Sequence, residues 1–521
     1  MHHHGKSRPL ALRRLWLAGV CVAVLTGCSF LPANDGRTLS TAVSPDAPGV
    51  LNRAIAPQRA AHPGLSGIHA LGSPQNAFAA RLLMLRAAEH SLDLQYYIWR
   101  SDLTGTLMFN ALREAADRGV RVRLLLDDQN TDGLDEVLAA LHGHANIEVR
   151  LFNPYAGRSA RLLQFVGDFS RLNRRMHNKS LTVDNQITLI GGRNIGDAYF
   201  GATDGVVFAD MDVLAVGPVV NQVSEDFDRY WAATSAYPVD RLLPEASHAA
   251  LDALEKRAAR VLQDEAAAEY VSTLRESAFV TRLLAGELPL EWASTRMVSD
   301  PPGKVLADKA SRRSMVHSLA DVIGGATRQL HIVSPYFVPT KTGVASLVVL
   351  RDAGVQVSVL TNSLEATDVG VVHAGYAKHR QALLRAGVRL YELRRASGAP
   401  SAQLFTGLVG SSAASLHAKT FAVDGARLFV GSFNFDPRSA ALNTELGFVI
   451  ESPALASDVA VAFDRAIPER AYELRLTDEG AINWIERANG NTVTYVREPG
   501  TGPLQRLLIG ILSLLPIDWL L

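Results

Sequence analysis

The sequence has little cysteine and no surplus of charge of either sign. Its only cysteines, Cys21 and Cys28, lie among the first 28 residues, so nothing downstream can form a disulfide or a thiolate metal site. Lys plus Arg and Asp plus Glu both number 52, and this balance argues against a nucleic-acid binder, which usually carries a basic excess. The 521 residues, 48% hydrophobic and 20% charged, have the composition of a folded protein of two or three domains.

The first 28 residues have the pattern of a bacterial secretory signal. A positively charged start precedes an apolar run from Leu15 to Leu25. The run ends in Leu25-Thr26-Gly27-Cys28, which resembles the lipobox of bacterial lipoproteins. That resemblance implies that Cys28 carries a lipid and tethers the chain, outside the cytoplasm, to an inner or outer membrane of the cell envelope. An uncleaved anchor with an incidental cysteine is the alternative.

The remainder of the chain contains an internal repeat of strand-like runs. The runs are Ser91–Trp99, Arg121–Leu126 and Ile147–Phe152, then Gln329–Phe337, Gln356–Leu360 and Val388–Leu393. Stretches with helical spacing, such as Ala77–Ala88 and Ala374–Ala386, separate them. This alternation predicts an α/β fold of two similar domains, each a largely parallel sheet flanked by helices.

Changes in composition give the expected domain boundaries. They are a signal over 1–28, a flexible tether over 29–65, a first domain over 66–243, a helical connector over 244–303, a second domain over 304–480 and an extension over 481–521. A helix over the apolar residues 504–515 would be about 18 Å long, too short for the roughly 30 Å hydrocarbon core of a bilayer. We expect it to lie in the bilayer interface or, alternatively, to pack on the protein's own core.

Two copies of one polar motif carry the strongest chemical signal. His177, Lys179, Asp184, Gly191 and Asn194 recur 240 positions later as His417, Lys419, Asp424, Gly431 and Asn434. Such a match at one offset does not arise by chance. A His and a Lys two residues apart on a strand share a face, which places a nucleophilic imidazole beside an anion-binding ammonium group. The turn before each Asn offers N–H groups to phosphate oxygens, so two facing copies would surround one phosphate.

A metal site is the alternative reading of any histidine. Each histidine here is paired with a lysine, whose charge repels a divalent cation, and spacings such as His-Glu-x-x-His are missing from the sequence. We therefore expect no metal and no other cofactor.

The duplicated motif resembles the paired His-x-Lys motifs of the phospholipase D superfamily. The resemblance covers residues 67–451, and the strand sequences with the Leu-Pro-Ile-Asp-Trp-Leu-Leu ending are similar to the cardiolipin synthase C-like branch. It implies two pseudo-symmetric domains with the active site at their interface. It also implies that His177 attacks phosphorus to form a phosphohistidine while His417 is the general acid and base, although pseudo-symmetry leaves the reverse assignment open.

The resemblance also implies roles for the remaining motif residues. The phosphoryl oxygens would be held by Lys179, Lys419, Asn194, Asn434 and Ser432, the last of which has Gly192 as its counterpart. Asp212 and Glu445 resemble the carboxylates that orient the two histidines. Asp184 and Asp424 belong to the catalytic motif but are expected to brace it. Asp127-Asp128, at the end of a strand, is either a functional position or a solvated turn.

The expected activity is transfer of a phosphatidyl group to a lipid alcohol, producing cardiolipin. Phosphatidylglycerol and phosphatidylethanolamine are the expected substrates, with a membrane but no nucleic acid as partner, and an accessory protein is left open. A hydrolase releasing phosphatidic acid is the alternative, because water can accept the same intermediate. Zero net charge and export disfavour a nuclease, and two intact motifs disfavour an inactive scaffold.

Overall fold

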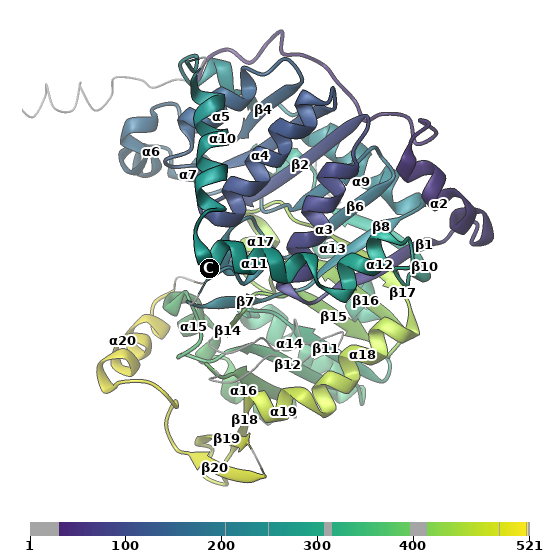
Figure 1. The fold of residues 1–521 in the computed structure, drawn as a ribbon. Helices are drawn as coiled ribbons and strands as arrows, with labels where there is room; N and C mark the ends of the chain where they lie inside the picture. Colours follow the sequence, from purple (N-terminus) through teal and green to yellow (C-terminus); the bar gives the residue numbers. More distant parts are fainter. Residues whose placement is uncertain are drawn as a thin grey trace, which may run out of the picture.

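The computed structural model describes residues 31–203, 205–247, 249–306, 315–395, 414–488, 490–516 and 518. The signal region with Cys28 lies outside these residues, so the lipid anchor stays a prediction. Two α/β halves follow each other along the chain, the first at the top of Figure 1 and the second at the bottom.

The first half is built on a mixed sheet in the order β9-β4-β3-β2-β5-β6-β8-β1. Its strands are β1 (Ser66–Leu71), β2 (Ser91–Ile98), β3 (Arg121–Asn130), β4 (Ile147–Phe152), β5 (Ser180–Val183), β6 (Ile187–Gly191), β8 (Asp212–Val216) and β9 (Ala236–Pro238). Strands β2, β3 and β4 pair in parallel, as the alternation of strands and helices predicted. The other neighbours pair antiparallel, so the sheet is mixed rather than largely parallel.

The second half repeats this order as β17-β16-β15-β11-β12-β13-β18, with β19 and β20 added at the edge. Its strands are β11 (Gln329–Val333), β12 (Gln356–Asn362), β13 (Arg389–Leu393), β15 (Thr420–Val423), β16 (Arg427–Gly431), β17 (Leu446–Glu451), β18 (Ala471–Leu476), β19 (Ile482–Ala488) and β20 (Asn491–Tyr495). Only β11, β12 and β13 pair in parallel among these strands of the described chain. The predicted α/β repeat is confirmed, since the two halves have the same strand order when the first is read from β8 and the second from β17.

Strand β10 (Glu291–Ser299) joins the two halves. Its first residues pair antiparallel with β1, and Ser294 to Ser299 pair antiparallel with β17. The two sheets therefore form one continuous sheet of 18 strands. The expected connector does contain helices α10 (Ala249–Val261), α11 (Glu265–Arg275) and α12 (Ala278–Leu284), but its bridging strand was not predicted.

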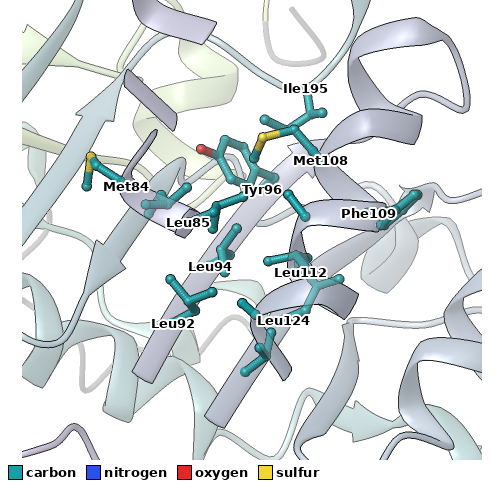
Figure 2. Packing of buried hydrophobic residues seen from close by; sticks show 14 of the residues in the cluster. Met84, Leu85, Leu92, Leu94, Tyr96, Met108, Phe109, Leu112, Leu124 and Ile195 are labelled. Carbon is teal, nitrogen blue, oxygen red and sulfur yellow. The ribbon is translucent and has the colours of Figure 1, made fainter. Parts of the chain in front are cut away.

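Helices bury the apolar face of the first-half sheet, as Figure 2 shows. Leu92 and Leu94 alternate along β2 and belong to one apolar cluster with Met108 and Leu112, which lie one turn apart on α4 (Leu103–Asp117). Helix α3 (Pro74–Ala87) packs beside α4. The opposite face of β2 is polar, because Asp93 pairs there with buried Arg123 at 2.7 Å. Helix α9 (Pro218–Trp231) covers this second face, and its Phe227 and Trp231 rings lie against the Arg123 guanidinium.

Residues 31–65, expected to be a flexible tether, instead follow the surface of the first half. Arg123 donates to the Ser40 carbonyl oxygen at 2.8 Å, and Asn185 donates to that of Val43 at 2.9 Å. Helix α2 (Val50–Ala61) completes the segment and buries Ile55. The tether prediction is wrong here, because buried polar groups of the sheet take their hydrogen-bond partners from this segment.

Helix α20 (Pro503–Ser513) ends the extension and lies at the lower left of Figure 1. Ile509 is buried against Leu364 and Ala374, the latter on α15 (Gly370–Ala377). The helix thus packs on the protein, although most of its leucines stay exposed. Across the described part of the chain, every helix is too short or too polar to cross a membrane.

Candidate active site

Each motif histidine lies in a segment that hydrogen-bonds to the other half. His177 lies between α7 (Phe169–Leu172) and β5, and its N–H donates to the Thr444 carbonyl oxygen at 2.9 Å. His417 follows β14 (Ala414–Leu416), which pairs in parallel with β7 (Val207–Ala209), and its N–H donates to the Ala209 carbonyl oxygen at 2.7 Å. These contacts hold both histidines at the boundary between the halves.

The carboxylate that orients each histidine comes from the opposite half. Nδ1 of His177 lies 2.8 Å from Oε2 of Glu445, and Nδ1 of His417 lies 2.6 Å from Oδ2 of Asp210. The other ring nitrogen, Nε2, is then the atom left for substrate on each histidine. Only 8% of His177 and 7% of His417 is exposed, so the site is largely shielded from water.

The acid on His417 is Asp210, and the prediction of Asp212 is wrong. Asp212 begins β8 and pairs with Arg81 at 2.9 Å and Arg193 at 3.3 Å, where all three side chains are buried. Strand register explains the difference. Gly191 pairs with Asp212 in the first half and Gly431 with Gly447 in the second, and the orienting acid lies two residues before each partner.

Two buried lysines give the site its positive charge. Nζ of Lys179 donates to the carbonyl oxygen of His177, and Nζ of Lys419 donates to that of His417. Burial lowers the pKa of Lys179 well below its usual value. Burial also lowers the pKa of Lys419, to about 8. Two ammonium groups held in a dry site would bind a phosphate strongly.

Burial and the lysines also lower the pKa of both histidines. Burial, then the charges of Lys179 and Lys419, lower the pKa of His177 well below its usual value. Burial and Lys419 lower the pKa of His417, but Asp210 opposes them. Against the effect of burial, His417 lowers the pKa of Asp210 to about 2, whereas burial raises that of Glu445 to about 7. The two pseudo-symmetric pairs are therefore electrostatically unequal.

The predicted phosphate-binding side chains lie close to the histidines. Oδ1 of Asn194 accepts from the Ile98 N–H at 3.1 Å, and its Nδ2 donates to the Tyr199 hydroxyl at 3.1 Å. The Tyr199 ring lies 5.3 Å from that of His417, and the Tyr97 ring lies 5.0 Å from that of His177. Asn434 is buried in the corresponding turn of the second half.

Ser432 and its counterpart Gly192 differ because their neighbouring acids differ. The Ser432 hydroxyl donates to Oε2 of Glu445, the same oxygen that contacts His177. A Cβ atom on Gly192 would lie 2.1 Å from Oδ1 of Asp210, so the shorter acid fills the space that the serine side chain would need. Ser432 was predicted to bind phosphate, but its hydroxyl proton is used to hold the Glu445 carboxylate.

Asp184 and Asp424 lie in the turns that follow β5 and β15. Asp184 accepts from the N–H groups of Glu89, His90 and Ser91 at 2.8–2.9 Å. Asp424 accepts from the equivalent N–H groups of Thr327, Arg328 and Gln329. Both aspartates have a positive φ, which Asp tolerates better than most residues. These contacts fit the bracing role expected for them.

Two further residues brace the motifs from the ends of β3 and β12. Oδ2 of Asp127 accepts from the Met176 N–H at 2.7 Å, and Asn362 bonds both the N–H and the carbonyl oxygen of Leu416. Each therefore hydrogen-bonds the backbone of the residue directly before a motif histidine. Asp127 is fully buried, so it does not lie in a solvated turn. The repeat itself contained the signal for Asn362. This residue lies as far beyond Gln356 as Asp127 lies beyond Arg121, at the start of the equivalent runs.

The described part of the chain contains no cluster of metal ligands. Among those residues, no three His, Cys, Asp or Glu side chains are grouped closely enough to hold a metal ion. The groups that the two motifs bring together are imidazole, ammonium, amide and carboxylate.

Comparisons with known proteins agree with this geometry. The family described as cardiolipin synthase, phospholipase D-like domain, matches residues 82–231 and again residues 319–467. Cardiolipin synthase C of Escherichia coli (strain K12) is 49% identical over 472 residues, which are 90% of this chain and 99% of that protein. Cardiolipin synthase of Geobacillus thermodenitrificans (strain NG80-2) is 25% identical over 423 residues, 78% of this chain and 70% of that protein.

A solved structure shares the fold at low sequence identity. The phosphatidylserine synthase of Haemophilus influenzae Rd KW20 superposes with a TM-score of 0.56 at 13% identity, over 90% of this chain and 100% of that one. The two family matches fall within the two halves of the continuous sheet, and each contains one His-x-Lys motif. The chain therefore belongs to the cardiolipin synthase family of phospholipase D-like domain proteins and carries that domain twice.

Proposed function

We propose that the protein is a phosphatidyltransferase that makes cardiolipin through a phosphohistidine intermediate. The observation that carries this proposal is the pair of buried histidines, each oriented through Nδ1 by a carboxylate of the opposite half. The relatives named cardiolipin synthase support the choice of lipid substrates. Phosphatidylglycerol is the expected donor and acceptor, and phosphatidylethanolamine a further donor.

The reaction is a double displacement at phosphorus. In the first step, Nε2 of His177 forms a bond to phosphorus while the bond to the leaving alcohol breaks, and protonated His417 gives its Nε2 proton to the departing oxygen. In the second step, His417 takes a proton from the incoming lipid alcohol, whose oxygen displaces His177 from phosphorus. Both histidines return to their starting state.

The different pKa values of Asp210 and Glu445 favour His177 as the nucleophile and His417 as the general acid. Asp210 stays ionised, since its pKa is lowered to about 2, and its charge stabilises the imidazolium that a general acid must form. The pKa of Glu445 is raised to about 7 by burial, so it does less to charge its histidine. A neutral His177 with a strongly lowered pKa suits the nucleophile.

The remaining polar groups hold the phosphoryl oxygens. Lys179 and Lys419 would balance the charge that develops in the transition state, with the Asn194 and Asn434 amides as further donors. Shielding of the site favours a lipid alcohol over water as acceptor, because few water molecules can reach the intermediate.

Product analysis tests the proposal. The purified protein would be incubated without metal in mixed phosphatidylglycerol and phosphatidylethanolamine vesicles, beside a His177→Ala variant, and the lipids identified by mass spectrometry. We expect cardiolipin that the variant does not make. Phosphatidic acid without cardiolipin would instead establish a hydrolase. In samples denatured at alkaline pH, which preserves the P–N bond, phosphohistidine should form in the His417→Ala variant but not in His177→Ala; the reverse pattern would exchange the two roles.

We also propose that Cys28 is lipidated and holds the catalytic halves at a membrane of the cell envelope. Support comes from the Leu-Thr-Gly-Cys sequence and from the envelope location of the lipid substrates. Intact-mass analysis of the mature protein tests this, because lipidation at Cys28 adds a diacylglyceryl group and removes the preceding residues. An accessory protein would be required if the purified chain made no cardiolipin while cell membranes that contain it did.

A further inference from the structure

Helix α20 presents an apolar face to the outside. Its large apolar residues Leu504, Leu507, Leu508 and Ile511, with Leu514 just beyond its end, are 52–84% exposed. Ile509 and Leu512 face the protein instead, packing beside Leu364 and Ala374. The polar positions Arg506 and Ser513 are less exposed than the leucines, the reverse of what water alone would favour. An apolar ridge of this length on a folded protein marks a surface that something else covers.

A second apolar ridge lies on the first half of the protein. Helix α6 (Arg161–Gly167) has no buried residue, and its Leu162, Leu163 and Val166 are 77%, 61% and 72% exposed. The two helices come from different halves, yet both protrude from the left side of the view in Figure 1.

Each ridge connects to the candidate active site through neighbouring segments. Helix α6 continues through α7 to His177, five residues beyond the last residue of α7. Helix α20 packs on α15, and Asp368, just before α15, accepts from the Tyr336 hydroxyl at 2.9 Å. The charge of Asp368 acts on Lys419. A surface that touches both helices would therefore also meet the approach to the two histidines.

The charge around α6 identifies the chemistry of that surface. Residues 158–175 contain five arginines, and Arg174 is the one for which no acidic partner lies within ion-pair distance in the described part of the chain, since the others pair with Asp127, Asp128, Asp135 or Asp168. Arg174 donates to the carbonyl oxygens of Lys304 and Ala441, which leave its positive charge unbalanced. Exposed apolar side chains with an arginine nearby fit a bilayer with anionic headgroups, whose acyl chains take up the leucines while a phosphate meets Arg174.

The start of the described chain lies on the same side of the first half. Asn34 donates to the Thr234 carbonyl oxygen at 2.9 Å, and Asn153 bonds both Ser235 and Arg174 at 2.7–2.8 Å. Residues 33 and 34 thus lie next to the segment that holds α7. Cys28, the proposed lipid site, is six residues before Asn34. An anchor there would bring the bilayer to this side.

We propose that α6 and α20 together form a face, the α6–α20 face, that docks on an anionic lipid bilayer and turns the active site toward the headgroups. The choice of a lipid partner rests on the proposed function, because a phosphatidyltransferase draws both substrates from a bilayer. Docking through one helix of each half would set the tilt of the enzyme, which a single point of attachment at Cys28 would leave free.

Site-directed spin labelling of the full chain tests where the bilayer contacts the protein. The chain has no cysteine after Cys28, so Leu163→Cys, Leu508→Cys and the control Val461→Cys can each be labelled. Val461 is 49% exposed on α18 (Pro453–Asp464), a helix of the second half outside the α6–α20 face. Vesicles would contain phosphatidylglycerol and phosphatidylethanolamine, and the parent protein would report background labelling.

We expect the labels at 163 and 508 to gain accessibility to oxygen and lose accessibility to a nickel chelate on vesicle binding, while the label at 461 does not change. Labels at 163 and 508 that stay accessible to the chelate in the vesicle-bound protein would overturn the proposal. Loss of accessibility to both reagents would also overturn it, because the face would then be covered by protein, either another copy or a partner.

Kinetics separate docking from the proposed function. The double variant Leu507→Ser/Leu508→Ser should raise the apparent KM for vesicle lipid about tenfold while turnover of a short-chain, monomeric phosphatidylglycerol stays the same. Val461→Ser should change neither. The His177→Ala variant should give the same labelling pattern without turnover. Correct labelling with no cardiolipin would reject the proposed function alone, and cardiolipin synthesis with an unchanged KM in the double variant would reject the α6–α20 face alone.

Discussion

Asp210 and Asp212 differ in role although they are two residues apart. Asp210 contacts His417, whereas Asp212 neutralises Arg81 and Arg193 inside the first half. The first contact serves the reaction and the second serves stability, since a buried arginine without a partner is costly. Replacing Asp210 by its amide should therefore lower activity, whereas replacing Asp212 by its amide should lower stability.

Asp210→Asn should lower kcat by about 10³–10⁴-fold with little change in unfolding temperature, because an amide cannot stabilise the His417 imidazolium. Asp212→Asn should destabilise the protein by about 3–5 kcal/mol and leave kcat of the folded fraction within a few-fold. Initial rates on vesicles and thermal unfolding measure the two effects. A large kcat loss at unchanged stability in Asp212→Asn would restore the prediction made from the sequence.

Loss of the positive charge of Lys419 should lower activity at alkaline pH. The pKa of Lys419 is lowered to about 8 by burial, so it loses its positive charge, and its hold on phosphate, above that pH. We expect kcat/KM to fall about tenfold per pH unit above pH 8. It should persist at pH 6, because the pKa of His177 lies well below 6.5 and the nucleophile stays neutral there.

The variant Lys419→Arg identifies the group responsible for this alkaline fall. Arginine stays charged throughout the range, so the alkaline fall should disappear even if the overall rate is lower. Lys256→Arg on exposed α10 is the matched control and should keep the wild-type profile. An alkaline limb that survives in Lys419→Arg would assign the fall to another group.

At the scale of elements, paired hairpins hold the motifs in place. In each half a turn aspartate ties the β5–β6 or β15–β16 hairpin to the start of the neighbouring parallel strand. The strand ends supply Asp127 and Asn362, which fix the residue before each histidine. The motif residues are thus positioned by backbone contacts on both sides.

Asp184→Ala should lower the free energy of unfolding by about 2–4 kcal/mol, because three backbone N–H groups lose their charged acceptor. Its kcat at about 20 °C should stay within a few-fold, since the carboxylate bonds the turn before β2 and not a motif histidine or lysine. Asp184→Asn keeps one acceptor oxygen, so its free energy of unfolding should lie between those of the wild type and Asp184→Ala. A kcat loss above 100-fold at unchanged stability would make Asp184 catalytic.

At the scale of the whole molecule, the two halves form one structural unit. Strand β10 pairs with strands of both halves, and each motif segment hydrogen-bonds across the boundary. Unfolding of one half would remove an orienting carboxylate and a strand partner from the other. The halves should therefore lose their structure together.

Calorimetry should show one unfolding transition for the full chain. Asp184→Ala in the first half and Asp424→Ala in the second should both shift that transition as a whole, with the smaller shift for the more exposed Asp424. Two separated transitions, each sensitive to only one of the variants, would show that the halves fold independently.

Local signals in the sequence predicted much of this. Hydrophobic alternation placed β2 and β4 within a residue or two of their observed bounds, because strand patterning depends on neighbours in the chain. Strand β10 was missed because its polar residues alternate irregularly and its partners, β1 and β17, lie more than 140 residues away in the sequence. Asp210 was missed for a similar reason, since its position is set by the register of β6 against β8.

The sequence by itself determined the chemistry, because a repeated His, Lys, Asp, Gly and Asn at one offset needs no structure to be recognised. Only the tertiary structure decided which acid serves which histidine. Glu445 lies 268 residues from His177 and Asp210 lies 207 residues from His417, so each pair forms only when the two halves meet. Spacing along a chain reports contacts within an element, whereas contacts between elements depend on how strands register and sheets join, and those follow from packing of the whole molecule.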